Sequence, residues 1–281
     1  MSVGPGWMMR MTSLIILLAA GILLDPPSAS GAATLTIPGT GGCEAALRSV
    51  ASVYERSHPL AKVVIPPSVH SEGGIRQVID GKAVLARVSR PLTPEEAGMG
   101  LTQRIFARDA VVFAVGTGVH IRNLTIRQLA DIFSGKIGTW ERLNGGNGPI
   151  RVLYRQAGES NLTRLRVAFK EFRELRFTRE GKALYYNSEM LEMLRKYGNS
   201  IGFLSLSTLH ESGAPTPHLA IDGVAPTPEN IVAGRYPIVA DYFLVYRKGA
   251  LPPEASDFID FLFDGEGRKS LSGHGLTPVD R

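Results

Sequence analysis

The sequence predicts an α/β fold, because two kinds of apolar pattern alternate along its 281 residues. Short apolar runs, typical of buried strands, are followed by segments whose apolar residues recur every three or four positions, as on one helix face. Turn residues, mainly glycine and proline, separate the segments. Such alternation favours a sheet of largely parallel strands flanked by helices.

The first half of the chain contains strands expected at 33–37, 62–65, 84–88 and 110–115. A helix at 44–57 is predicted by the helical spacing of Leu47, Val50, Ala51 and Tyr54. After a loop at 66–74, a shorter helix at 75–81 is predicted by Ile75, Val78 and Ile79. The next helix, at 124–133, has Thr125 as its expected N-cap.

The second half continues the alternation, with strands expected at 149–154, 201–204 and 238–246. Helical spacing predicts helices at 162–172, 189–197, 255–263 and 266–273. Gly198 is the expected end of the second of these helices. Four prolines between 211 and 230 predict a surface loop with irregular strand.

The N-terminus has the layout of a secretory signal peptide, which we assign to residues 1–32. Arg10 precedes an apolar run of eleven residues at 14–24, and small residues follow at 28–33. That run is too short for a stable membrane span, so cleavage is expected near Ala32; an uncleaved anchor is the alternative. The sequence therefore predicts export to the periplasm.

The charge and cysteine content narrow the function classes. The net charge of +5 is scattered, and no block of like charges indicates nucleic-acid binding. Cys43, the only cysteine, cannot form an intramolecular disulfide and is expected to be a small buried residue rather than a nucleophile. The six histidines show no i,i+4 pair, and the phosphate-loop and Gly-x-Ser-x-Gly motifs are missing. We expect no metal, no cofactor and no catalysis.

Three loops rich in small polar residues precede expected helices, at 39–42, 71–74 and 155–161. Glycine lets a backbone approach a ligand closely, and hydroxyls and helix-entry N–H groups donate hydrogen bonds to anions. The third loop adds Arg155, a planar and permanently charged donor. Because such loops gather at the carboxyl ends of strands, the sequence predicts an oxyanion site.

These loops, together with 88–92, 124–140 and the C-terminal segments 258–268 and 275–278, resemble the periplasmic phosphate-binding proteins of ABC transporters. The resemblance implies a two-lobed type II periplasmic-binding-protein fold, with a mixed sheet flanked by helices in each lobe and two hinge strands between them. It implies one lobe made of 33–113 and 241–281 and another of 114–240. It also implies a monomer that delivers its ligand to an inner-membrane permease.

By position, the resemblance implies donors from Thr40 and Gly41, from Ser71, and from Arg155 with Ser160 and Asn161. Two positions differ from the family. Glu159 lies where phosphate binders usually have serine, and Ser89 lies where they carry an aspartate that accepts the ligand's proton. Glu159 would accept a proton from the ligand or turn outward, and either Glu159 or Glu72 could take the role of the absent aspartate.

The sequence thus predicts an exported protein that captures phosphate or a related oxyanion for an ABC transporter. The alternative is a sensory or interaction protein with the same fold and a degraded or altered anion site, since Glu159 and Ser89 depart from the family. A hydrolase would need a nucleophile–base pair or a metal cluster, and the sequence offers neither.

Overall fold

The structure is a computed structural model, and it describes residues 1, 33–213 and 215–281. The expected signal peptide, apart from Met1, lies outside the described residues. No helix within the described part of the chain is long and apolar enough to cross a membrane.

A seven-stranded sheet forms the centre of the fold, with the order β3-β10-β4-β8-β6-β7 and with β11 beside β4. Its strands are β3 (Ala86–Val88), β4 (Leu101–Val115), β6 (Arg151–Arg155), β7 (Lys182–Leu184), β8 (Ser200–Ser205), β10 (Val239–Arg247) and β11 (Thr277–Pro278). Only the β8-β6-β7 pairings are parallel, whereas β10 runs antiparallel to both of its neighbours, and β4 antiparallel to β8.

The prediction of largely parallel strands is therefore wrong for the middle of the sheet. The alternation of strands and helices fixes the order of elements along the chain but not which strands become neighbours. Strand β10 comes late in the sequence and lies between β3 and β4, which it separates. The mixed sheet implied by the family resemblance is confirmed.

Strand β4 changes partner along its length. Its residues 101–110 pair with β10, and its residues 111–115 pair with β8. The paired stretch ends at Ala110 opposite Val239, and the next residue, Val111, lies opposite Ser205. Strands β4 and β10 therefore carry the chain from one lobe into the other, as expected of hinge strands.

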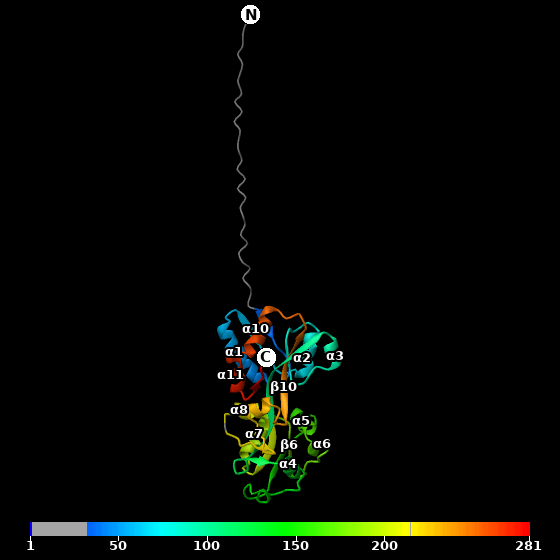
Figure 1. Cartoon of the computed structure of the whole chain (residues 1–281), viewed down its shortest axis with the longest axis vertical. Helices are drawn as coiled ribbons and strands as arrows, with labels where there is room; N and C mark the ends of the chain where they lie inside the picture. Colours follow the sequence, from blue (N-terminus) through cyan, green and yellow to red (C-terminus); the bar gives the residue numbers. More distant parts are fainter. Residues whose placement is uncertain (2–32, 214) are drawn as a thin grey trace. The chain divides into compact units, whose positions relative to one another are not determined.

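The first lobe packs helices around one end of these strands, as Figure 1 shows. Its helices are α1 (Glu44–Ser57), α2 (His70–Ile79), α3 (Pro94–Gly98), α10 (Pro253–Leu262) and α11 (Gly265–Gly273). A parallel pair, β1 (Ala33–Thr36) and β2 (Ala61–Val64), completes it. Leu47, Phe106 and Phe258 belong to its main hydrophobic core, so α1, β4 and α10 pack together.

The second lobe surrounds the other end of β4 (Figure 1). Its elements are β5 (Asn123–Leu124), α4 (Ile126–Phe133), the 3₁₀ helix η1 (Trp140–Leu143), α5 (Ser160–Ala168), α6 (Lys170–Arg173), α7 (Asn187–Lys196), α8 (Leu206–Glu211), β9 (Ala220–Ile221) and α9 (Pro228–Val232). Phe113 of β4 contacts the rings of Phe133, Phe172 and Phe203 at the centre of a separate core. Each lobe thus has its own core.

Several expected elements are confirmed, and α1 has the bounds that the sequence predicts. Thr125 caps α4 by accepting a hydrogen bond from the N–H of Gln128. The helix expected at 162–172 is instead two helices, because Phe169 adopts an extended conformation between α5 and α6. The region 211–230, expected to be loop and irregular strand, also contains α9, which Thr227 caps.

Helix α2 corrects a further expectation, since it begins at His70 and not at Ile75. The segment expected as a loop at 71–74 is its first turn. Glycine disfavours helix, but a Cβ at Gly74 would lie 2.8 Å from the Cα of Gly39. Close packing of α2 on the first loop therefore outweighs the low helix propensity of glycine.

Candidate functional site

The first loop, Gly39–Gly42, is held by a buried arginine of β3. Arg87 is fully buried and donates to the carbonyl oxygens of Thr40 and Pro66, each at 2.7 Å, and to Ile37. Its remaining partner is the carboxylate of Glu44, at 3.2 Å. Burial lowers the pKa of Arg87, but these acceptors compensate its charge. Arg87 therefore shapes the first loop from beneath and does not face the cavity.

Three hydroxyl groups from separate segments meet above this arginine. The Oγ of Ser89 lies 3.4 Å from Oγ1 of Thr40 and 3.5 Å from Oγ of Ser71. The hydroxyl of Ser71 also accepts a hydrogen bond from the Ser89 N–H at 3.1 Å. We call Thr40, Ser71 and Ser89 the hydroxyl cluster. The sequence singled out all three residues, and the structure brings them together.

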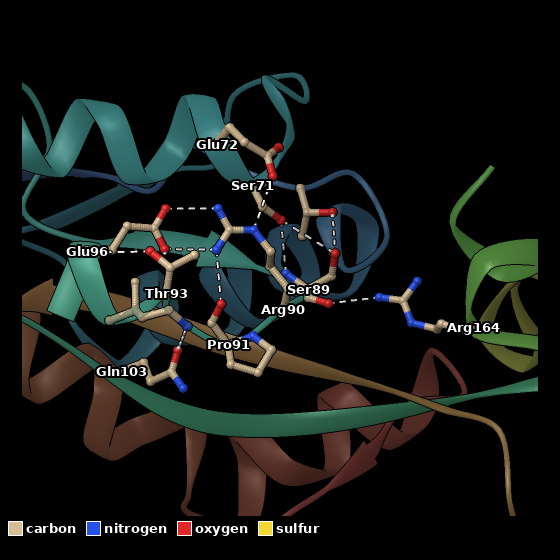
Figure 2. Close-up of polar contacts among 11 residues, drawn as sticks. Ser71, Glu72, Ser89, Arg90, Pro91, Thr93, Glu96, Gln103 and Arg164 are labelled. Atoms are coloured by element: carbon tan, nitrogen blue, oxygen red, sulfur yellow. Dashed lines mark hydrogen bonds and ion pairs between the residues drawn. The ribbon is translucent and has the colours of Figure 1, made fainter. Parts of the chain in front are cut away.

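Beside the cluster, Arg90 is held between two carboxylates, as Figure 2 shows. Its Nε donates to Glu72 at 3.1 Å, and its Nη1 and Nη2 donate to Glu96 at 2.9 Å. These bonds lower the pKa of Glu96 to about 2. A hydrogen bond from the Thr93 N–H also lowers this pKa, whereas burial of the carboxylate raises it. The pKa of Glu72 is also lowered, by its own backbone N–H and by Arg90. Glu72 is therefore an ionised partner of Arg90.

Arg155 is the last residue of β6, and its side chain is only 2% exposed. Its Nη1 donates to the carbonyl oxygen of Tyr186 at 2.8 Å, and its Nη2 donates to Oδ1 of Asn187 at 3.0 Å and to Oε1 of Glu159 at 3.1 Å. Its Nε is a buried donor without a hydrogen-bond partner among the described residues. Protein acceptors already occupy much of the donor fork that the sequence assigned to the ligand.

Glu159 turns inward and caps helix α5. Its Oε2 accepts from the N–H groups of Asn161 at 2.9 Å and Leu162 at 3.1 Å, while its Oε1 bonds Arg155. These N–H groups are among the unpaired donors that make a helix N-terminus attractive to anions. Of the two orientations expected for Glu159, the outward one is wrong, because the helix N-terminus and Arg155 together attract the carboxylate.

The predicted residues border one cavity of about 440 Å³. Seven of the eight line it, namely Thr40, Gly41, Ser89, Arg155, Glu159, Ser160 and Asn161. The eighth, Ser71, lines a cavity of about 650 Å³ that shares Thr40, Ser89 and Ser160 with the first. Ser160 is exposed, whereas the Asn161 side chain is buried. The cavities together join the first lobe's hydroxyl cluster to the start of α5.

Arg164 is a further candidate for the site, which the sequence did not single out. From α5 its Nη2 donates to the carbonyl oxygen of Ser89 at 2.8 Å, which bridges the two lobes beside the hydroxyl cluster (Figure 2). It lines both cavities and, among the described residues, forms no ion pair. Its position one helical turn after Ser160 was the available signal, because residues four apart share a helix face.

The rim of the smaller cavity also includes Tyr185, Tyr186 and Asn187, which the sequence analysis did not select. The two tyrosine side chains are exposed, and their rings meet edge to face. Asn187 accepts from Arg155 and donates to Oγ1 of Thr208 at 3.1 Å, so its amide orientation is fixed. These residues follow β7, a strand that the sequence pattern did not reveal.

A buried carboxylate lies where β4 passes between the lobes. Asp109 accepts from the hydroxyl of Ser207 at 2.6 Å and from its N–H at 3.1 Å. Burial raises the pKa of Asp109 to about 7, although both bonds from Ser207 oppose the rise. The pair links the hinge strand to α8.

Other reactive groups do not assemble into a site in the part of the chain that the structure describes. That part contains no group of three His, Cys, Asp or Glu side chains that could hold a metal ion. Cys43 is buried, as expected, and burial raises the pKa of its thiol to about 12. A thiol with so high a pKa is a poor nucleophile.

Comparison with known proteins agrees with the motifs. The family model described as a PBP superfamily domain matches residues 25–266. The phosphate-binding protein PstS of Borreliella burgdorferi is 24% identical over 278 residues, covering 97% of this chain and 99% of the relative. PstS of Bacillus subtilis is 28% identical over 251 residues, covering 88% and 81%. An ABC transporter substrate-binding protein of Clostridium perfringens, solved with bound phosphate, gives a TM-score of 0.69 at 25% identity and covers 88% of this chain and 100% of that one.

Proposed function

Because the chain belongs to the PBP superfamily, we propose that it is an extracytoplasmic solute-binding protein that captures phosphate or a related oxyanion for an ABC transporter and catalyses no reaction. The relatives named as phosphate-binding proteins support the ligand class. The observation that carries the proposal is the meeting of the hydroxyl cluster with Arg164 across one cavity. Hydroxyls and a guanidinium are donors suited to an oxyanion.

Ligand capture would proceed by closure of the two lobes. Thr40, Ser71 and Ser89 belong to the first lobe, whereas Ser160 and Arg164 belong to the second. An anion bound between them would join the lobes by charge-assisted hydrogen bonds, and β4 and β10 would bend as the hinge. The sequence predicts lobes of 33–113 with 241–281 and of 114–240, and we propose that their boundary in β4 lies after Ala110, where the strand changes partner from β10 to β8. The closed form would be the state that a permease recognises.

The signal peptide at 1–32, the periplasmic location, the monomeric state and the inner-membrane permease partner form the rest of this proposal. They rest on the N-terminal sequence pattern and on the family, since such receptors act outside the cytoplasmic membrane. The eight residues selected from the sequence, together with Arg164, are the proposed residues of the binding cleft, in which Arg155 and Glu159 are paired with each other.

Calorimetric titration of the purified chain with phosphate, arsenate, sulfate and molybdate tests the proposal. We expect at least one of these anions to bind with a dissociation constant well below millimolar, because several charge-assisted hydrogen bonds would form in a closing cleft. Binding no tighter than millimolar for all four would refute the transport-receptor function.

A second function is a sensory or interaction protein that keeps the fold with an altered anion site. The contact between Glu159 and the α5 N-terminus favours it, because the protein's own carboxylate takes donors that an anion would use. Failure of all four anions to bind, with an intact fold, would favour this function instead.

A further inference from the structure

The carboxylate of Glu159 occupies the position of an anion at the α5 N-terminus. Two backbone N–H groups and the guanidinium of Arg155 converge on it at 2.9 to 3.1 Å. The Arg155 side chain is only 2% exposed, and its Nε is a buried donor that forms no hydrogen bond with any described residue. The site is therefore built for an anion, and the protein supplies one itself.

The charges around the cavity of about 440 Å³ follow from this contact. Its acidic lining residue is Glu159, and its arginines are Arg155 and Arg164. The Arg155–Glu159 pair is neutral, so one positive charge, that of Arg164, is left for a ligand. Arg164 also lines the adjoining cavity, where the other arginine, Arg90, is paired with Glu72 and where Asp241 is paired with Arg108.

We propose that Glu159 is a specificity-determining residue that reduces the cleft to one unpaired cation and so lowers its preference for doubly charged oxyanions over singly charged ones. The inference rests on the proposed function, because it concerns the ligand of the same cleft. A doubly charged anion beside Arg164 would be repelled by Glu159 twice as strongly as a singly charged anion, because Coulomb energy scales with charge. To bind Arg155, it would also have to displace the carboxylate from α5.

Two variants remove the carboxylate in different ways. Glu159→Gln keeps the side-chain length, whereas Glu159→Ser supplies a good N-cap for α5 and so protects the fold. Glu174→Gln, on an exposed residue outside the cavity, removes the same charge elsewhere in the second lobe. Calorimetry at neutral pH would use sulfate as the dianion, methanesulfonate as the tetrahedral monoanion, and phosphate.

We expect both Glu159 variants to bind sulfate at least about tenfold more tightly than the unmodified chain, with a smaller gain for methanesulfonate. Glu174→Gln should bind like the unmodified chain. Circular dichroism of each variant checks that the fold is kept.

The outcomes separate the two claims. Oxyanion binding by the unmodified chain, with sulfate affinity unchanged or weakened in both Glu159 variants, overturns the role of Glu159 and leaves the proposed function standing. Sulfate binding by the variants alone supports the role of Glu159 and overturns oxyanion capture by the natural chain. Binding of no probe by any chain overturns both claims, and an equal gain in Glu174→Gln overturns the specific role.

Discussion

Arg164 of helix α5 donates from Nη2 to the carbonyl oxygen of Ser89 at 2.8 Å, although 75 residues separate them in the sequence. The bond spans the two lobes and places a guanidinium at the backbone of Ser89, whose hydroxyl contacts those of Thr40 and Ser71. Because Arg155 is committed to protein acceptors, Arg164 is the cation that an anion entering the cleft would meet.

The first prediction concerns this cation. Arg164→Ala should weaken oxyanion binding by about 2 kcal/mol or more, roughly 30-fold, because a charged donor in the closed cleft is lost. Calorimetry with phosphate measures the change. Arg173→Ala, which removes an exposed arginine of α6 in the same lobe, is the matched control. Equal affinities for the Arg164 variant and the natural chain would exclude a direct contact with the ligand.

The second prediction concerns the buried pair. Arg155→Met should lower the free energy of unfolding by about 3 to 5 kcal/mol, because it leaves the carboxylate of Glu159 without its cation. Chemical denaturation measures this loss. Combining Arg155→Met with Glu159→Ser should recover part of it, since the unpaired charge is then removed as well. Additive losses in the double variant would show that the two side chains do not interact.

The third prediction concerns the pH dependence of stability. Burial raises the pKa of Asp109 to about 7 in the folded chain, whereas an exposed aspartate titrates near 4. A raised carboxyl pKa means that the folded state keeps its proton to a higher pH than the unfolded state does. The contribution of Asp109 to the free energy of unfolding is therefore full below about pH 4 and is lost as pH rises towards 7. As pH rises from about 4 to 7, the free energy of unfolding of Asp109→Asn should therefore increase by roughly 3 to 4 kcal/mol relative to that of the natural chain.

Denaturation at several pH values measures that difference. A constant difference between Asp109→Asn and the natural chain across the range would mean that Asp109 titrates normally. Ser207→Ala should raise the pKa of Asp109 further, because both bonds from Ser207 favour the charged form and its hydroxyl is one of them.

The fourth prediction concerns the first loop. Gly39→Ala should destabilise the chain by at least about 2 kcal/mol, because the new Cβ would lie 1.8 Å from the carbonyl oxygen of Arg87 and the backbone φ is +143°. Thermal denaturation compares it with Gly98→Ala, where a Cβ meets no atom within 4 Å and φ is not in the left-handed region. Comparable melting temperatures for the two variants would argue against a fixed first loop.

The sequence predicts the site residues better than it predicts their partners. Thr40 and Ser71 stand out because they lie in loops rich in small polar residues before expected helices, which is a local pattern, whereas Ser89 stands out only by its position in the family resemblance. The inward turn of Glu159 depends on two backbone N–H groups and on Arg155, so it becomes visible only when strand and helix are placed in space.

The bridge from Arg164 to Ser89 was beyond prediction for the same reason. A helix pattern gives the face on which Arg164 lies, but not the lobe that this face meets. Likewise, the position of β10 between β3 and β4 depends on long-range pairing. Local patterns therefore predict strands, helices and caps such as Thr125, whereas contacts between lobes require the fold.

A crystal structure of the chain grown with phosphate tests the central claim most directly. We expect one phosphate within hydrogen-bond distance of the hydroxyls of Thr40, Ser71 and Ser89 and of the guanidinium of Arg164. The account would be contradicted by a phosphate bound away from these groups, or by an empty cleft at saturating phosphate.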